Sequence, residues 1–224
     1  MSRRLTLFLV LASSLTMPSA ALARQETTTE AGVVAGSGES HLFFGATARS
    51  LPPGHGYFGV REIGFGAFQI GITNRFSFGA GTVLAYPKVV VITPKYQVYQ
   101  GKDISAAVGV AHLVGARDFG LGAAYGAVTK EFKSGSLTTG GGVLYARDDH
   151  KTARVGVAMI GGERRLSSRV IFVTENYVFF AGGAVASAGV RLVRGRFATD
   201  LGLIAPIFEG PFIPGPVVNF GWTF

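Results

Sequence analysis

The stretch VVNFGWTF, residues 217–224, ends the chain and alternates between bulky apolar and small or polar side chains. Successive side chains of a β-strand point to opposite faces, so this stretch predicts a strand with one apolar and one polar face. Such a strand suits a barrel wall that has lipid outside and a polar interior. An ordinary half-buried strand is the alternative. The residues on the apolar face are Val218, Phe220, Trp222 and Phe224.

The amino-terminal sequence predicts export. Arg3 and Arg4 precede an apolar stretch over residues 5–15, and Ala21 and Ala23 fit an A-x-A cleavage site. These are the parts of a secretory signal peptide, and the apolar stretch is too short to span a membrane as a helix. The chain is therefore expected to contain a cleaved signal peptide, a polar leader and a barrel domain, over residues 1–23, 24–40 and 41–224.

The composition favours an all-β fold. Hydrophobic residues make up 48% of the chain and charged residues 15%. Beyond the signal peptide, no apolar run approaches the roughly 18 residues that a membrane helix needs. The 33 glycines interrupt the apolar segments, and spaced glycine weakens a helix but is tolerated in a curved sheet. The chain has no cysteine, so neither a disulfide nor a lipid anchor on cysteine can hold it.

Alternating segments separated by turn residues predict about twelve strands. The first two are expected over His41–Ala48 and Tyr57–Thr73, and the register of the second is open near residues 62–66, where the alternation changes phase and suggests a bulge. A strand over residues 89–99 contains Pro94, which predicts a local irregularity because proline donates no ladder hydrogen bond. The other expected strands cover residues 76–85, 104–114, 119–130, 136–147, 153–164, 170–179, 185–194, 197–205 and 217–224.

An even number of strands with one apolar face fits a closed barrel. In lipid every backbone donor and acceptor must be paired, and a closed sheet achieves this without free edges. We therefore predict an all-β fold, a transmembrane antiparallel up-and-down β-barrel of about 12 strands, with a range of roughly 10 to 14. A secreted β-sandwich or solenoid is the soluble alternative, but it would need polar residues on faces where this chain has Phe, Val and Leu.

The carboxyl-terminal run Val218, Phe220, Trp222 and Phe224 resembles the β-signal of bacterial outer-membrane barrel proteins. The whole chain is similar in architecture to short-looped members of the porin-like superfamily. The resemblance implies a Gram-negative outer membrane, contact with its lipids, and insertion by the barrel assembly machinery through the last strand. Both chain ends would then be periplasmic, and residues 52–56 would form an outer loop. A likeness of this kind implies a fold and a location, and it carries over no catalytic residue.

Alternation assigns a set of polar side chains to the interior of the expected barrel. Basic groups outnumber acidic ones in this set, with Arg49 and Arg154 expected near the outer rim, and rings of Arg and Lys favour anions in pores. Arg191 and Asp200 are expected to form a diagonal ion pair between neighbouring strands. No loop is long enough to fold inward, so side chains alone would narrow the lumen. The expected lumen-lining residues are Arg61, Lys95, Gln97, Glu175, Arg191 and Asp200.

Three functions stay open. The leading hypothesis is a small-bore passive pore for small solutes, anions among them, and the second is a non-conducting structural, anchoring or binding barrel. An embedded hydrolase is third, because Asp148 and His150 resemble half of the omptin protease site. No second acidic pair is visible, so we expect no enzyme and assign no catalytic residue. No phosphate loop or metal-ligand spacing occurs, so neither cofactor nor metal is expected. The net charge of +8 fits lipid or solute contact, whereas nucleic acid binding would need a clustered basic patch on a soluble domain.

Overall fold

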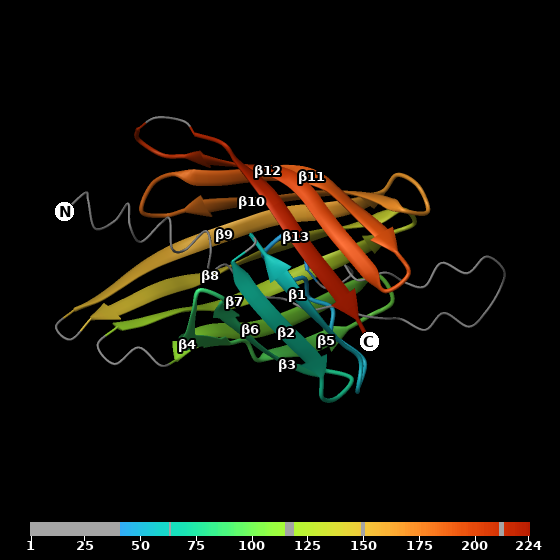
Figure 1. Ribbon diagram of the computed structural model, residues 1–224, viewed down its shortest axis with the longest axis horizontal. Helices are drawn as coiled ribbons and strands as arrows, with labels where there is room; N and C mark the ends of the chain where they lie inside the picture. The colour runs from blue at the N-terminus through green and yellow to red at the C-terminus, as the bar shows by residue number, and fades with distance from the viewer. Residues whose placement is uncertain (1–40, 63, 115–118, 149–150, 211–212) are drawn as a thin grey trace.

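The computed structural model describes residues 41–62, 64–114, 119–148, 151–210 and 213–224, and its strands form one sheet (Figure 1). Each strand pairs antiparallel with its neighbours. The strands are β1 (Gly56–Arg61), β2 (Phe65–Gly71), β3 (Phe76–Val83), β4 (Tyr86–Ile92), β5 (Lys95–Gln100), β6 (Ile104–Val114), β7 (Phe119–Phe132), β8 (Gly135–Asp148), β9 (Thr152–Arg165), β10 (Val170–Phe179), β11 (Ala184–Arg194), β12 (Phe197–Ile207) and β13 (Gly215–Thr223).

The sheet closes on itself between its first and last strands. Tyr57 of β1 lies opposite Thr223 of β13, and Arg61 lies opposite Asn219. A closed sheet has no free strand edge. The predicted all-β, antiparallel up-and-down barrel is therefore confirmed. Among the described residues there is no helix of the length and apolarity needed to cross a membrane.

The strands β4 and β5 share one position in the wall. Both pair with β3 on one side and with β6 on the other, and they are separated by Thr93 and Pro94. Pro94 has no N–H to donate, so the ladder is interrupted where the sequence predicted an irregularity. The 13 strand segments thus occupy 12 positions around the barrel.

The predicted count is right, but two of the predicted strands are wrong. Residues 41–48 form no wall strand. The segment expected as one strand over residues 57–73 is instead the hairpin of β1 and β2, which turns where Gly64 N–H donates to Arg61 O and where Glu62 has a positive φ of 48°. The change of phase at residues 62–66 therefore marks a turn and not a bulge. One strand lost and one gained leave the total unchanged.

Residues 52–56 lie at the same end of the barrel as the carboxyl terminus, so their assignment to an outer loop is wrong. Gly54 N–H donates to Gly71 O at 2.9 Å, and Gly56 and Phe224 exchange backbone hydrogen bonds of 3.2 and 3.0 Å. We call this end, with the turns after β2, β5, β7, β9 and β11, the terminal rim. The opposite end is the loop rim. The error follows from counting residues 41–48 as a strand, which reverses the direction of the chain at residue 52.

The outer face of the wall is apolar. Phe58 and Phe68 are about half exposed on the outside, where the Phe58 ring packs edge-on against Trp222 at 5.3 Å between centroids and Phe68 stacks on Phe224 at 6.0 Å. Phe220 is likewise exposed. An apolar exterior of this kind suits lipid contact. The aromatic residues of the carboxyl-terminal run thus lie on the outside, and their role in assembly stays a prediction.

The inside of the barrel is polar only in part. Near the loop rim, inward side chains of β2, β4, β6, β7 and β8 pack into an apolar cluster that includes Phe65, Val91, Leu113 and Leu121. A second cluster joins β9, β10, β11 and β13 to residues 42–44. The polar interior expected from alternation is therefore interrupted by two apolar clusters. Alternation shows that a face points inward, but it does not show what occupies the inside.

Candidate functional site: the segment inside the barrel

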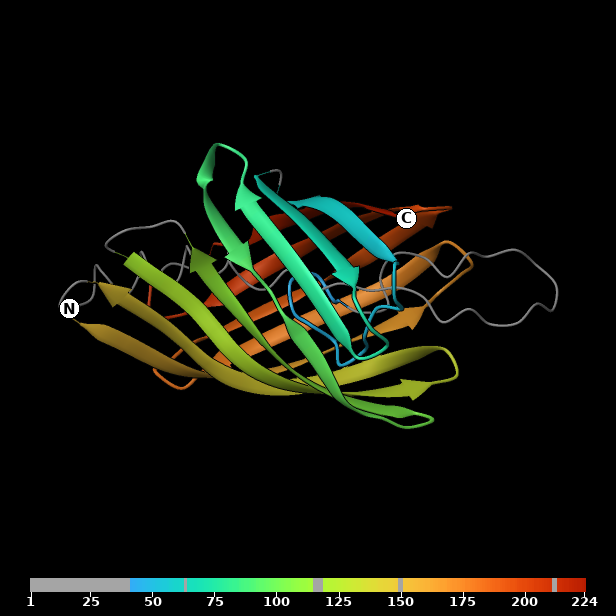
Figure 2. The same ribbon diagram turned by 90° about the horizontal axis from the view of Figure 1, so that it is seen from below.

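Residues 41–51, which we call the inner segment, lie inside the barrel rather than in its wall. In Figure 2 this blue segment runs between the green strands on one side and the orange strands on the other. Leu42, Phe43 and Leu51 are completely buried. The segment bends back on itself, because His41 forms an antiparallel bridge with Ala46 and Leu42 N–H donates to Gly45 O at 3.1 Å. The segment thus turns within the lumen and reaches the terminal rim at Leu51, whose N–H donates to Ser77 Oγ at 3.2 Å.

A carboxylate of the wall holds the tip of the inner segment. Glu175 on β10 accepts hydrogen bonds from the backbone N–H groups of Phe44 at 2.9 Å and Gly45 at 2.7 Å. The hydroxyl of Tyr177 donates to the same carboxylate. A Cβ atom on Gly45 would lie 2.6 Å from the Tyr177 hydroxyl oxygen, so only glycine allows this approach. Hydrogen bonds to a charged acceptor are stronger than neutral ones, and the tip is therefore firmly placed.

Two arginines and an asparagine hold the carbonyl groups of the segment. Arg61 donates to Phe43 O at 3.3 Å and to Phe44 O at 3.4 Å. Arg191 donates to His41 O at 3.1 Å and to Leu42 O at 2.7 Å. Asn219 donates to Phe43 O at 3.2 Å. Side chains from β1, β11 and β13 thus satisfy backbone groups that would otherwise be buried without partners.

Arg191 and Asp200 form the predicted ion pair, with Nε to Oδ1 at 2.6 Å and a second contact at 3.1 Å. The two residues lie directly opposite each other on β11 and β12 rather than diagonally. Glu163 lies 3.7 Å from the same guanidinium. Both carboxylates and the guanidinium are almost fully buried. Removing Arg191 would leave the buried carboxylate of Asp200 without its ion-pair partner.

The part of the inner segment nearest the terminal rim has its own set of contacts. Lys95 Nζ donates to the carbonyl oxygens of Thr47 and Arg49. Ala48 N–H donates to Thr129 Oγ1 at 2.9 Å. Arg49 pairs with Glu131 and, at 2.8 Å, with Glu163. The sequence placed Arg49 near the outer rim, and that placement is wrong because residues 41–51 are not part of the wall.

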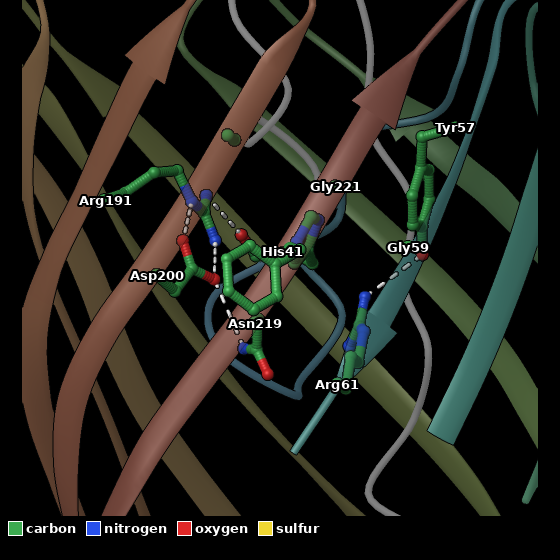
Figure 3. A pocket seen from close by; sticks show the side chains of 10 residues that line it. His41, Tyr57, Gly59, Arg61, Arg191, Asp200, Asn219 and Gly221 are labelled. Carbon is green, nitrogen blue, oxygen red and sulfur yellow. Dashed lines mark hydrogen bonds and ion pairs between the residues drawn. The ribbon is translucent and has the colours of Figure 1, made fainter. Parts of the chain in front are cut away.

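A small pocket lies beside His41, lined by Tyr57, Arg61, Arg191 and Asp200 among others (Figure 3). The imidazole stacks on the Tyr57 ring with 5.5 Å between centroids. Its Nδ1 atom is buried and has no hydrogen-bond partner. Burial, reinforced by the positive charge of Arg191, lowers the pKa of His41 well below its ordinary value. His41 is therefore neutral at pH 7 and adds no charge beside the guanidinium groups.

All six residues that alternation assigned to the lumen are buried. Arg61, Lys95, Glu175 and Arg191 contact the inner segment directly, and Asp200 supports it through Arg191. Their part in lining an open pore stays a prediction, as does that of Gln97. Arg154, expected near the rim in the same set, is exposed at the start of β9. Sequence reasoning missed the wall partners Thr129, Glu131, Glu163 and Asn219.

The inner segment itself left one signal in the sequence. Leu42, Phe43 and Phe44 are three consecutive apolar residues, and Gly45 and Ala46 follow them. A wall strand with lipid on one face would alternate instead. The run therefore fits a segment that is buried on all sides.

A single cysteine can report whether the inner segment stays inside, because the chain contains none. Cysteine in place of the fully buried Ala48 should react with a water-soluble maleimide at least about tenfold more slowly than cysteine in place of the exposed Ser168. The labelling rates of the two folded variants are to be compared in detergent. Equal rates would show that the segment spends most of its time outside the barrel.

The residues that suggested a hydrolase cannot be placed together. Asp149 and His150 lie outside the described residues, and of this stretch only the backbone of Asp148, at the end of β8, is described. In the described part of the chain, no three His, Asp or Glu side chains gather as a metal ion would require. The absence of enzymatic activity stays a prediction.

The fold is similar to that of solved porins. The NanC porin in a rhombohedral crystal form matches with a TM-score of 0.55 at 8% identity, over 76% of this chain and 98% of that chain. The KdgM porin matches with a TM-score of 0.54 at 7% identity, over 76% of this chain and 96% of that chain. The KdgM porin in complex with disordered oligogalacturonate matches with a TM-score of 0.52 at 7% identity, over the same shares of the two chains. No protein-family model matches the chain, and no curated protein matches it significantly in sequence. At these identities the likeness concerns the fold alone, and the chain has the fold of a porin-like antiparallel β-barrel of 12 strands.

Proposed function

We propose that the protein is an outer-membrane channel for small solutes that is closed, in the described conformation, by its own inner segment. One observation carries this proposal. The wall closes through strand pairing alone, while residues 41–51 are held inside it only by non-covalent contacts. The segment can therefore leave without breaking the barrel. The apolar outer face supports a membrane location, and the porin-like fold supports a channel.

The basic residues inside the barrel hold the segment in the described conformation. Arg61, Lys95 and Arg191 each donate to its carbonyl groups. A solute could bind to these groups only after the segment has moved. We infer that opening the channel and exposing its positive charges are one event.

We infer no preference for anions from the charges inside the barrel. Arg49, Arg61, Lys95 and Arg191 are balanced, within the described residues, by an equal set of inward acidic residues. With the inner segment gone, Arg49 leaves with it and acidic groups slightly outnumber basic ones. We therefore propose passage of small solutes with little charge preference, in place of the anion preference expected from the sequence. The inward acidic residues are Glu131, Glu163, Glu175 and Asp200.

A planar lipid bilayer measurement on Glu175→Ala tests the closed-channel proposal. The substitution removes the carboxylate that accepts from Phe44 and Gly45. Hydrogen bonds to a charged group contribute about 1.5–3 kcal/mol, so the open time should rise at least about tenfold above that of the native protein. Asn176→Ala is the matched control, because Asn176 is the next residue on β10 and its side chain bonds outside, to Ile160 O and Thr174.

Silence of the inserted Glu175→Ala variant at all voltages would contradict the proposal. The filled lumen favours one other function, a non-conducting barrel in which the inner segment completes the core. That function would be supported if weakening the segment lowered stability without producing current.

A further inference from the structure

We propose that the terminal rim carries a binding surface for the phosphate groups of anionic phospholipids. Besides Arg75 and Lys102 in the turns after β2 and β5, its basic residues lie at the ends and turns of β7 to β12, which are consecutive neighbours in the sheet. All of them are exposed. We call this set the basic arc: Lys130, Lys133, Arg164, Arg165, Arg169, Arg194 and Arg196. It lies at the end of the barrel where C is marked in Figure 1.

In the described part of β7 to β12, no residue with a carboxylate is exposed at this rim, and the exposed Asp103, in the turn after β5, borders the arc beside Lys130. The acidic residues of this stretch, Glu131, Glu163 and Asp200, point into the barrel and are paired there with Arg49 or Arg191. Seven exposed basic residues against the one bordering carboxylate of Asp103 leave the arc with a net positive field on the outside of the rim. Fields of this kind attract anionic surfaces over about one Debye length, roughly 8–10 Å at ordinary ionic strength.

Apolar side chains next to the arc identify the partner as a lipid. Phe132, Leu166 and Phe197 are each more than half exposed on the same rim. Arg194 lies opposite Phe197 in the register of β11 and β12, and Lys130 Nζ is 5.7 Å from the centre of the Phe132 ring. Long basic side chains beside exposed aromatic rings suit a membrane interface, where the stem lies along apolar surface and the charge reaches a phosphate. An acidic protein would not need this apolar border.

The loop rim differs in charge. Its basic residues Lys88, Arg147, Lys151 and Arg154 are accompanied by Glu62, Asp148 and Glu209. The asymmetry orients the barrel with its terminal rim in the leaflet that contains anionic phospholipid. This inference rests on the membrane location proposed above but not on conduction.

The test measures lipid retention by native mass spectrometry. The native protein is released from detergent micelles doped with equal amounts of phosphatidylglycerol and phosphatidylcholine. The arc variant is Lys133→Gln/Arg165→Gln/Arg169→Gln/Arg196→Gln, and the matched control, Lys88→Gln/Arg147→Gln/Lys151→Gln/Arg154→Gln, loses the same charge at the loop rim. The native protein and the control should retain phosphatidylglycerol in preference, and the arc variant should retain at least about tenfold less of it.

Equal retention of phosphatidylglycerol by the arc variant and the control would overturn the lipid surface. So would binding of polyglutamate by the arc without any preference for phosphatidylglycerol, which would indicate an acidic protein partner. The membrane location itself would be overturned by two results together: equal gel mobility of the heated and unheated protein, and no insertion of the protein into vesicles. A channel that stays silent in bilayers affects only the proposed conduction.

Discussion

Deletion of residues 41–51 should convert a closed barrel into a conducting one. The wall keeps every strand pairing, because β1 and β13 close it without help from the inner segment. The deletion removes Leu42, Phe43 and Phe44 from the apolar cluster that fills the middle of the lumen. Wall positions without a bulky side chain, such as Gly202 beside the Phe43 ring, then face open space. We expect steady current in planar bilayers, with the open fraction raised at least about 100-fold over the native protein because several stabilising contacts are lost together.

The reversal potential of the deletion variant tests the proposed lack of anion preference. Three basic side chains, Arg61, Lys95 and Arg191, face the four acidic ones named above. In a salt gradient, the reversal potential should be near zero or should indicate a slight preference for cations. A strong anion preference would contradict the charge balance.

The deletion also removes buried apolar surface, so folding must be checked separately. The variant Leu42→Ser/Phe43→Ser/Phe44→Ser keeps the chain length and loses the packing of the segment. Both variants should still migrate differently in gels before and after heating. If both are folded and inserted but silent, the inner segment is not what closes the barrel.

The fold was largely predictable because its signal is local. The alternation of Phe220, Trp222 and Phe224 predicted a last strand over residues 217–224, and β13 covers Gly215–Thr223. The interruption at Pro94 is predictable from one residue, because proline lacks the N–H that would donate a ladder hydrogen bond at its own position. Period-two patterns report which face of a strand is apolar, and this is enough to specify a barrel.

The inner segment was not predictable in the same way. Its partners are distant in the chain, as Gly45 and Glu175 are separated by 130 residues, and such contacts leave no periodic trace. Residues 41–48 have the composition of a wall strand, so composition alone does not distinguish them from one. The six predicted inward residues were found because each lies on a regular strand. What they bind is determined by tertiary packing, which overrides local pattern.

Substitution of Arg191 by Met should be among the most destabilising single changes in this protein. The guanidinium is buried between Asp200 and Glu163 and also donates to the carbonyl groups of His41 and Leu42. Removing one partner of a buried ion pair leaves the other charge uncompensated and costs about 3–5 kcal/mol. The free energy of unfolding, measured with guanidinium chloride in detergent, should fall by that amount. Arg196→Met, in the exposed turn after β11, should change it by less than about 0.5 kcal/mol.

A double-mutant cycle separates the ion pair from the packing of Arg191. Replacing both partners, as Arg191→Met/Asp200→Leu, removes the stranded carboxylate and should recover part of the lost stability, because apolar pairs often replace buried ion pairs without loss. Recovery must be incomplete, since the carbonyl groups of the inner segment still lose their donor. The double variant should therefore be more stable than Arg191→Met. When both carry Ala48→Cys, the double variant should nevertheless react with maleimide faster than the otherwise native protein. If the double variant were no more stable than the single one, the charges of Arg191 and Asp200 would not be coupled.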